Sequence, residues 1–329
     1  MGSCSRFPGD REIHDTKVLD DTLVVTAIHF EHTRVETARV QIENVDESLE
    51  AGKKLTESIP HDGLRHAFVL SDGLMINGTM LVEGLKAGLP AGTSLTGGLS
   101  ADGDRFEETL VLWEERATSG TVAILGLYGD RLQVGYGSLG GWDSFGPERL
   151  ITKSNGNVLY EVDGQSVLSL YKKYLGEHAA GLPATGLLFP LSVRTEMDKE
   201  PVVRTLLSVD EGEQSMTFAG DMPEGAFARL MKANSDRLIE GAEGAARVSS
   251  SAMNGAPSEL AILISCVGRK LVLKHLIEEE VESVREILGP DTTLAGFYSY
   301  GEISPFSPGA KCELHNQTMT VTTFSEKAA

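Results

Sequence analysis

Short runs of alternating apolar and polar residues recur along the first part of the chain. Such alternation, rich in β-branched residues, is typical of strands. Two stretches between the runs repeat apolar residues at helical spacing, and the one at 46–58 carries acids before lysines, as the helix dipole favours. The expected strands are 22–30, 67–71, 108–114, 121–129 and 131–137, and the expected helices are 46–58 and 74–87.

The pattern changes near residue 140, where "LGGWDSFGPERL" is rich in glycine and interrupted by proline. This segment predicts a boundary between a domain at 1–138 and a second at 139–329. The predicted fold class is mixed α/β (α+β): two domains whose mixed β-sheets are covered by helices. In the second domain we expect strands at 149–161, 186–193, 201–209, 214–219, 260–265 and 293–298, helices from Asp163, at 224–240 and at 269–288, and a loop at 241–259.

Three segments share one plan, in which a glycine and an acidic residue lead through a loop into an apolar strand. They are "GDREIHDTKVLDDTLVV" (9–25), "GDRFEETLVL" (103–112) and "GEISPFSPGAKCELHNQTMTV" (301–321). Either the likeness is chance, or homologous turns occupy equivalent places in related α/β units.

Charge and cysteine usage narrow the function. The formal net charge of −19 argues against binding nucleic acid or an acidic membrane surface, because both require clustered Lys and Arg. Cys4, Cys266 and Cys312 have no paired spacing, so neither disulfides nor a structural zinc site are expected. No apolar run reaches the roughly 18–20 residues of a membrane span, and the start lacks the apolar core of a signal peptide. These features predict a cytoplasmic protein.

One cysteine has the surroundings of a possible nucleophile. Cys266 follows an apolar run in "LAILISCVGRK", with Gly268 and a helix behind it. Arg269 and the helix N-terminus would lower the thiol pKa, as at a nucleophile elbow, and His315 is the available base. The elbow pattern, however, requires glycine at the position of Ile264. Two interpretations stay open: an inert buried cysteine, or a cysteine-dependent hydrolase.

The segment "GFYSYGEISPF" (296–306) is the best candidate for a binding site. On a strand, Tyr298 and Tyr300 point to one side and Ser299 to the other, and a turn at Gly301 leaves Glu302 at the rim. Phenolic hydroxyls and a carboxylate suit a ligand with donor groups, such as an ammonium. The alternative is that these groups satisfy the backbone of a long turn.

Five other residues extend this candidate site. Asn316 and Thr318, at the start of the next strand, supply an amide and a hydroxyl, and Arg269 is a further candidate contact. Trp142 and Asp143 follow a glycine-rich turn and are expected to form part of a pocket wall between the domains.

Six motifs, taken in order, resemble the FIST family of prokaryotic sensory modules. They are "GGWDSFGP", "GNVLYEVDG", "LYKKYLG", "ISCVGRK", "GFYSYGEISP" and "HNQTMTVTTFSE". Family members usually carry a further α/β stretch that ends in a "GCSTxGEI"-like turn, which "GSCSRFPGDREI" matches only in part. The resemblance therefore implies a FIST N-terminal domain shortened at its start (1–138) and a FIST C-terminal domain (139–329).

The resemblance implies a non-catalytic sensory protein of signal transduction that binds a small molecule, an amino acid or similar polar metabolite. A separate output protein, such as a sensor kinase or a cyclic-nucleotide enzyme, would carry the signal onward. No cofactor is expected in this interpretation. The alternative that the family suggests is a haem-binding nitric oxide sensor that acts on a partner histidine kinase, with His315 as the haem ligand.

Overall fold

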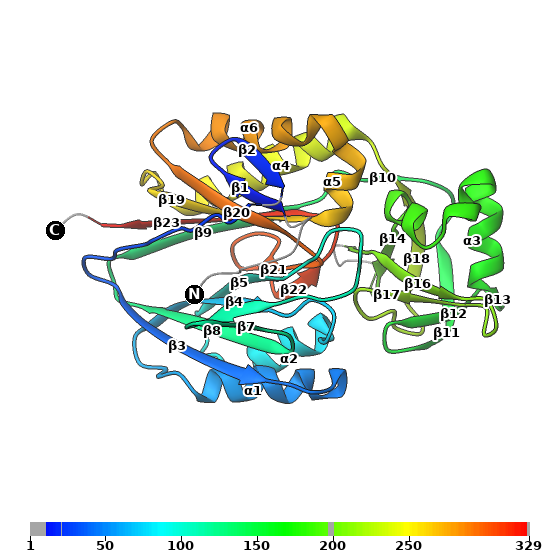
Figure 1. The fold of residues 1–329 in the computed structure, drawn as a ribbon, viewed down its shortest axis with the longest axis horizontal. Coiled ribbons are helices and arrows are strands. Elements are labelled where there is room, and N and C mark those ends of the chain that lie inside the picture. Colours follow the sequence, from blue (N-terminus) through cyan, green and yellow to red (C-terminus); the bar gives the residue numbers. More distant parts are fainter. Residues whose placement is uncertain (1–10, 21, 197–200, 328–329) are drawn as a thin grey trace.

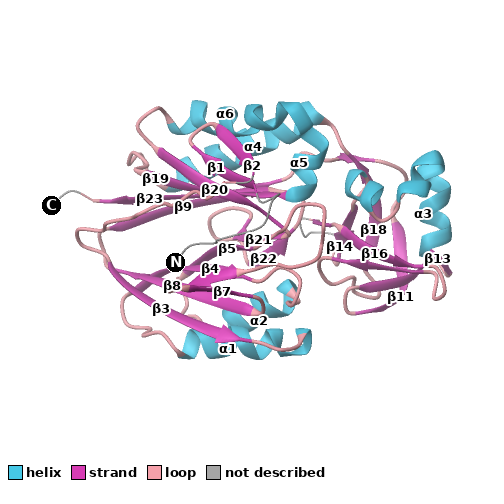
Figure 2. Cartoon of the chain, in the orientation of Figure 1, coloured by secondary structure: helices cyan, strands magenta, loops and turns pink. Residues whose placement is uncertain are grey.

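The computed structural model describes residues 11–20, 22–196 and 201–327. Two six-stranded β-sheets face each other, and helices cover the outer face of each, so the main body has four layers (Figure 1, Figure 2). A smaller domain, formed by residues 143–232, lies at one end of this body. Among the described residues, no helix is long and apolar enough to cross a membrane. The predicted fold class, mixed α/β with helix-covered mixed sheets, is confirmed.

The first sheet combines strands from both ends of the chain, in the order β22–β21–β5–β4–β8–β3. Its strands alternate in burial: Ala67 and Val69 pack toward helices α1 and α2, whereas Phe68 and Leu70 face the other sheet. The elements are β3 (Arg34–Gln41), β4 (Leu64–Ser71), β5 (Ser94–Leu99), β8 (Thr121–Tyr128), β21 (Gly301–Pro305), β22 (Cys312–His315), α1 (Ser48–Glu57) and α2 (Gly78–Gly88).

The second sheet has the order β2–β1–β20–β19–β23–β9, with three helices on its outer face. Its central strands β19 and β20 are parallel and buried on both sides, which explains the uninterrupted apolar run at 260–265. The elements are β1 (Arg11–His14), β2 (Lys17–Asp20), β9 (Leu132–Leu139), β19 (Leu260–Cys266), β20 (Thr293–Ser299), β23 (Met319–Glu326), α4 (Ser235–Ala252), α5 (Val267–Leu273) and α6 (Ile277–Leu288).

The small domain has its own hydrophobic core beneath helix α3. The strands of the small domain mostly form antiparallel hairpins. A separate two-stranded ribbon, β6–β7, belongs to the main body and is included in the list below. The elements are β6 (Val111–Trp113), β7 (Arg116–Thr118), β10 (Asp143–Ser144), β11 (Arg149–Asn155), β12 (Val158–Val162), β13 (Gln165–Ser166), α3 (Val167–Leu175), β14 (Leu191–Arg194), β15 (Val202–Arg204), β16 (Leu206–Asp210), β17 (Ser215–Phe218) and β18 (Phe227–Lys232).

The two sheets are built on the same unit, a parallel strand pair joined by a helix. Gly97 of β5 and Gly296 of β20 occupy equivalent positions, because a Cβ atom on either would lie 2.0 or 1.9 Å from a carbonyl oxygen of the adjacent parallel strand. A hairpin pairs with each of these strands: Ile13 of β1 lies opposite Gly296, and Ile303 of β21 lies opposite Gly97. Over their described residues, the segments 9–25 and 301–321 therefore occupy equivalent positions, each beside the second strand of a parallel pair.

Strands on both sides of the predicted domain boundary at residue 139 share the same sheets. β9 ends at Leu139 and pairs with β23 along its whole length, while β21 pairs with β5. The compact insertion instead spans residues 143–232, between β9 and α4. The glycine-rich segment therefore marks where the chain leaves the main body, and no comparable signal marks its return.

The strand predicted at 22–30 does not form. These residues have no regular secondary structure and join the second sheet to the first. Most of "TLVVTAIHF" is exposed, with only Val24 and Phe30 half-buried, so its alternation does not mark a strand with one buried face. No strand edge pairs with this backbone in the described part of the chain.

The helix predicted at 224–240 and the loop predicted at 241–259 were both wrong. Strand β18 ends at Lys232, and α4 then continues to Ala252. The small residues that suggested a loop let α4 approach the end of β9 closely: a Cβ atom at Gly241 would lie 2.3 Å from the carbonyl oxygen of Gly140. On the strand side, a Cβ atom at Gly137 would lie 2.5 Å from the carbonyl oxygen of Ala245. Here glycine and alanine are packing residues rather than turn residues.

Four other boundaries moved. The helix expected from Asp163 begins at Val167, with Ser166 as N-cap accepting from the Ser169 N–H at 3.2 Å. The run at 149–161 is the hairpin β11–β12, and 201–209 divides into β15 and β16. The helix expected at 269–288 is interrupted at Lys274, whose φ is +53°.

Candidate functional site

Tyr298 lies in β20 and Tyr300 directly follows it, and both turn to the same side of the sheet, as the strand alternation predicted. Both belong to the core beneath the helices of the second sheet, and Ser299 points the other way, toward Glu302. The Tyr300 hydroxyl donates to the Asp102 carboxylate, and its ring stacks on Phe106 with centroids 4.6 Å apart. Tyr300 is therefore already engaged within the protein.

Glu302 is fully buried rather than at the rim, which corrects the prediction from the sequence. The hydroxyl of Ser299 donates to Oε1, and the N–H and hydroxyl of Thr318 donate to Oε2 at 3.2 and 2.9 Å. Burial raises the Glu302 pKa to about 8 despite these hydrogen bonds. At neutral pH the carboxyl is largely protonated, so it does not supply the fixed negative charge expected of it.

The segment that leads into β23 keeps three polar atoms buried without a hydrogen-bond partner among the described residues. They are His315 Nδ1, Asn316 Oδ1 and Gln317 Oε1. The Asn316 amide donates to the Tyr300 carbonyl at 2.9 Å, and the Gln317 amide reaches the small domain at the Leu187 carbonyl, 3.4 Å away. Unpaired buried acceptors cost stability, so this junction is open to a hydrogen-bond donor.

Trp142 and Asp143 lie where the chain enters the small domain. The Trp142 indole is buried and donates from Nε1 to the Gln317 carbonyl at 2.8 Å. The Asp143 carboxylate accepts from the Asn234 amide at 3.1 Å. Both residues thus lie at the join between the two parts, as expected, although neither lines the cleft described below.

Arg269 is a fully buried structural cation. Its Nε lies 3.2 Å from the Glu280 carboxylate, and its two Nη atoms donate to the carbonyls of Gly140 and Leu238 at 2.5 and 2.7 Å. The guanidinium holds the second sheet's helices to the chain that enters the small domain, and all three of its nitrogens are occupied.

The two alternative chemistries find little support in the geometry. Burial raises the pKa of the Cys266 thiol, opposing the thiolate that a hydrolase needs. His315 donates from Nε2 to the Ser304 carbonyl at 2.7 Å, and its ring packs 4.2 Å from that of Phe306. Burial lowers the His315 pKa to about 4. The imidazole is buried against an aromatic ring and lines neither cavity described below, so the described structure shows no space for a haem beside it.

A cavity of about 580 Å³, lined by both charged and apolar side chains, lies between the main body and the small domain. The body contributes α2 and the β21–β22 hairpin, and the small domain contributes β14, β15 and the segment after β17. Clefts of this size between two parts of a chain are typical of small-molecule sites. Its charged and polar lining residues are Thr79, Glu83, Lys86, Thr195, Arg204, Asp221, Ser307, Lys311 and Glu313.

Arg204 is the distinctive group of this cleft, because it is a cation with only 5% of its surface exposed. Its Nη1 donates to the Leu314 carbonyl of the main body at 2.9 Å, and its Nε lies 3.4 Å from the Asp221 carbonyl. Nη2 has no hydrogen-bond partner among the described residues. Burial lowers the Arg204 pKa to about 10, against the opposing effect of nearby carboxylates, so the group stays charged at neutral pH.

Asp221 supplies the opposite charge in the same cavity. Its Oδ1 accepts from the Asn77 amide of α2's N-cap at 3.1 Å, while Oδ2 has no partner in the described part of the chain. Sequence reasoning missed both Arg204 and Asp221. The only signal was an arginine within the largely apolar run "PVVRTLLSV", which by itself predicts no site.

Comparisons with known proteins identify the family. The FIST N domain matches residues 8–165 and the FIST C domain matches residues 168–305. No curated protein matches the chain. One solved structure that matches, a cyanuric acid hydrolase from A. caulinodans, is 11% identical, covers 90% of this chain and 100% of its own, and has a TM-score of 0.21, too low to carry an argument. The two domain matches span most of the chain, which therefore belongs to the FIST family, whose domains are sensory modules that bind small ligands in signalling.

Proposed function

We propose that this protein is a non-catalytic sensor that binds a zwitterionic metabolite of the amino-acid class in the cleft between the main body and the small domain. One observation carries the proposal: Arg204 lines the cleft, is almost fully buried, and has a free Nη2 among the described residues. A ligand carboxylate would pair with that edge of the guanidinium. Such charge-assisted hydrogen bonds are among the strongest available to a binding site.

The opposite charges of the cleft favour a ligand with both signs. Oδ2 of Asp221 is open to an ammonium group, and Glu313 and Lys311 add charge at the hairpin side. A ligand with only a negative charge would pair with Arg204 but be repelled by the carboxylates. A ligand with only a positive charge would pair with the carboxylates but be repelled by Arg204. A zwitterion satisfies both.

Ligand binding in this cleft has a direct route to a signal. Arg204 and Asp221 belong to the small domain, yet their present partners, the Leu314 carbonyl and the Asn77 amide, belong to the main body. A ligand that bonds across this join changes how tightly the two parts are held together. We infer that a separate cytoplasmic output protein, such as a sensor kinase or a cyclic-nucleotide enzyme, distinguishes the two states.

In this proposal, the site residues predicted from the sequence do not contact the ligand but support the residues that line the cleft. Glu302 and Tyr300 hold the start of the β21–β22 hairpin, and Asn316 and Thr318 tie its end to them. The same hairpin carries Glu313 and Leu314 into the cleft. They are positioning residues, so their substitution is expected to change the shape of the wall rather than remove a ligand contact.

The first experiment is a thermal-shift screen of the whole chain. The panel contains amino acids together with their amine-only and acid-only analogues. A compound that binds only the folded state raises the apparent midpoint. We expect at least one amino acid to do so and both of its single-charge analogues to be weaker. A panel with no shift at millimolar concentration, or one in which an analogue equals its parent, would contradict the proposal.

The second experiment tests Arg204 with the amino acid that gives the largest shift. Arg204→Lys keeps the charge but loses the Nη2 donor, and should raise the dissociation constant roughly ten- to hundredfold, as for a lost hydrogen bond of about 1.5–3 kcal/mol to a charged group. The matched control is Arg229→Lys, since Arg229 also donates to a carbonyl in the small domain but lies outside the cleft. Equal affinity of the two variants in calorimetry would place the site elsewhere.

A further inference from the structure

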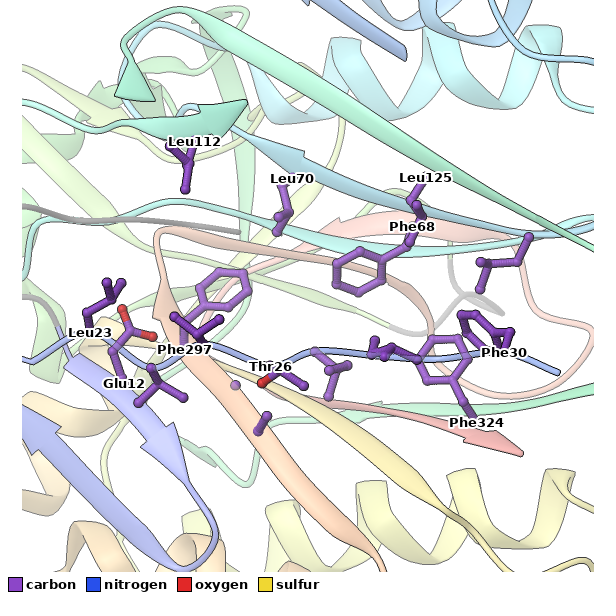
Figure 3. Close-up of a pocket in the computed structure, with 17 residues that line it drawn as sticks. Glu12, Leu23, Thr26, Phe30, Phe68, Leu70, Leu112, Leu125, Phe297 and Phe324 are labelled. Carbon is purple, nitrogen blue, oxygen red and sulfur yellow. The ribbon is translucent and has the colours of Figure 1, made fainter. Parts of the chain in front are cut away.

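A second cavity, of about 440 Å³, lies between the two sheets and is lined almost entirely by apolar side chains (Figure 3). Phe68 enters it from the first sheet, Phe297 and Phe324 enter it from the second, and Phe30 closes one end. It shares no lining residue with the metabolite cleft. The two cavities are therefore separate sites.

Residues 22–30, which we call the strap, cover this cavity. The strap has no backbone hydrogen bond to either sheet among the described residues, and the chain is next fixed at Glu326, which accepts from the N–H groups of Glu31 and His32 at 2.7 and 3.1 Å. Three apolar strap side chains are exposed: Leu23 by 57%, Val25 by 78% and Ile28 by 46%. A cover held only by side-chain contacts can lift without breaking any hydrogen-bonded strand pair.

The cavity carries charge at one end only among its described lining residues. Glu12 lies at the end opposite Phe30 and Phe324, and it is the one charged side chain among the described lining residues (Figure 3). It occupies in β1 the place that Glu302 occupies in β21, since Glu12 pairs with Phe297 and Glu302 with Gly98 in equivalent hairpins. A molecule lying along the cavity would meet aromatic rings along its length and a carboxyl group at one tip.

We propose that this cavity binds an elongated apolar small molecule whose uncharged or cationic head lies at Glu12. The volume is that of a small-molecule site. A protein segment does not fit: facing sheets lie about 10 Å apart, a helix with its side chains is about 10–12 Å wide, and the strap already occupies part of the gap. An apolar occupant would remove these mostly apolar side chains from water, which is favourable.

The direct test uses N-phenyl-1-naphthylamine, a neutral probe that fluoresces when removed from water. The folded chain should enhance its emission saturably, and 1-decanol and decylamine should displace it. Decanoate should compete at least tenfold more weakly, because its head would lie against Glu12. Absence of enhancement, or equal displacement by all three, would overturn the proposal. Displacement by haem alone would identify a different occupant and overturn it as well.

Two strap variants locate the probe. Val24→Trp fills the cavity from the strap and should weaken probe binding at least tenfold, whereas His29→Trp adds the same ring to the same segment at a position that does not line the cavity. Equal affinity of the two variants would contradict the proposal. An alkyl diazirine probe gives a measurement free of substitutions: photolabelling should fall on the strap and β4, and labelling confined elsewhere would also contradict it. Arg204→Lys should leave probe affinity unchanged, which separates this result from that of the metabolite cleft.

Discussion

Glu302 and Arg204 are both buried ionisable side chains near the join between the main body and the small domain, but their surroundings differ. Glu302 accepts three hydrogen bonds from Ser299 and Thr318, and its environment favours the neutral acid. Arg204 keeps its charge and leaves one guanidinium nitrogen open toward a cavity. Glu302 thus has its hydrogen-bond partners within the protein, whereas in the proposed function a ligand carboxylate supplies the partner that Arg204 Nη2 lacks among the described residues.

The buried carboxyl predicts a specific pH dependence of stability. Folding raises the Glu302 pKa from its usual 4.5 to about 8, so between these values the folded chain holds a proton that the unfolded chain releases. Its contribution to the free energy of unfolding is therefore greatest below pH 4.5 and is lost as the pH rises toward 8. Glu302→Gln has no such proton, so relative to the parent chain it should gain stability from pH 5 to pH 8.5.

Urea denaturation of both chains at a series of pH values measures this difference. Taking the difference removes the contributions of other titrating groups that the two chains share. Glu57→Gln, an exposed position at the end of α1, is the control and should follow the parent chain. Parallel stability curves for Glu302→Gln and the parent would show that the carboxyl is ionised in the folded protein.

At the scale of elements, close backbone approach explains where pattern reading failed. Helix α4 is rich in glycine, alanine and serine, and it lies directly on the glycine-rich strand β9. The same residue types favour loops in an exposed segment and close contact in a buried one. Their role depends on whether another element lies against them, which a single segment of sequence does not state.

This contact yields a prediction about packing. Gly137→Ala places a Cβ atom 2.5 Å from the Ala245 carbonyl oxygen, and relieving that clash must move α4 or β9. We expect a loss of about 1–3 kcal/mol in the free energy of unfolding, the usual cost of overpacking. Gly212→Ala is the matched control, since its exposed Cβ atom would lie 3.3 Å from a side-chain oxygen. If denaturation shows equal losses in both variants, α4 does not rest on β9 as closely as described.

At the scale of the whole molecule, the small domain is an insertion in the chain that forms the main body. Strands from before and after this insertion pair within the same sheets of the body. β9 precedes the insertion and β23 lies near the C-terminus, yet they are neighbours in one sheet. The insertion contacts the body through polar pairs, among them Arg204 with Leu314 and Gln317 with Leu187, and through Met231 and Val203, which pack with the core of the second sheet. Interfaces between two parts of one chain commonly allow relative movement unless they are large and hydrophobic.

Ligand binding in the cleft should therefore be visible at the join. Trp113→Phe leaves Trp142 as the one tryptophan of the chain. Its Nε1 donates to the Gln317 carbonyl, and the Gln317 amide reaches the small domain. We expect the amino acid selected by the thermal-shift screen to change Trp142 emission saturably, with the same dissociation constant. Unchanged emission at saturation would mean that the cleft binds without moving the join.

The sequence by itself determined the fold class, the family and part of the strands of the two sheets, among them β4, β8, β9, β19 and β20, whereas β3 and β5 were not predicted. Strands such as β4, β8 and β19 were predictable because alternation and uninterrupted apolar runs report burial over a few neighbouring residues. The same local reasoning found the alternation of Tyr298 and Tyr300 about Ser299. Of the three segments with a shared plan, 9–25 and 301–321 contain hairpins with equivalent pairing over their described residues, which favours related units over chance for these two.

Only the tertiary structure decided where the insertion ends, how α4 lies on β9 and which groups form the cleft. Arg204, Asp221 and Leu314 are separated by long stretches of chain and meet only because β21–β22 joins a sheet formed much earlier in the sequence. Glu302 likewise looked like a rim residue, because a glycine turn beside it normally lies at a surface. It is buried because β22 and β5 flank it on both sides. The periodicity of apolar residues reports which face of a single helix or strand is buried. A binding site depends on the distances between residues of different elements, and those distances are set by tertiary packing.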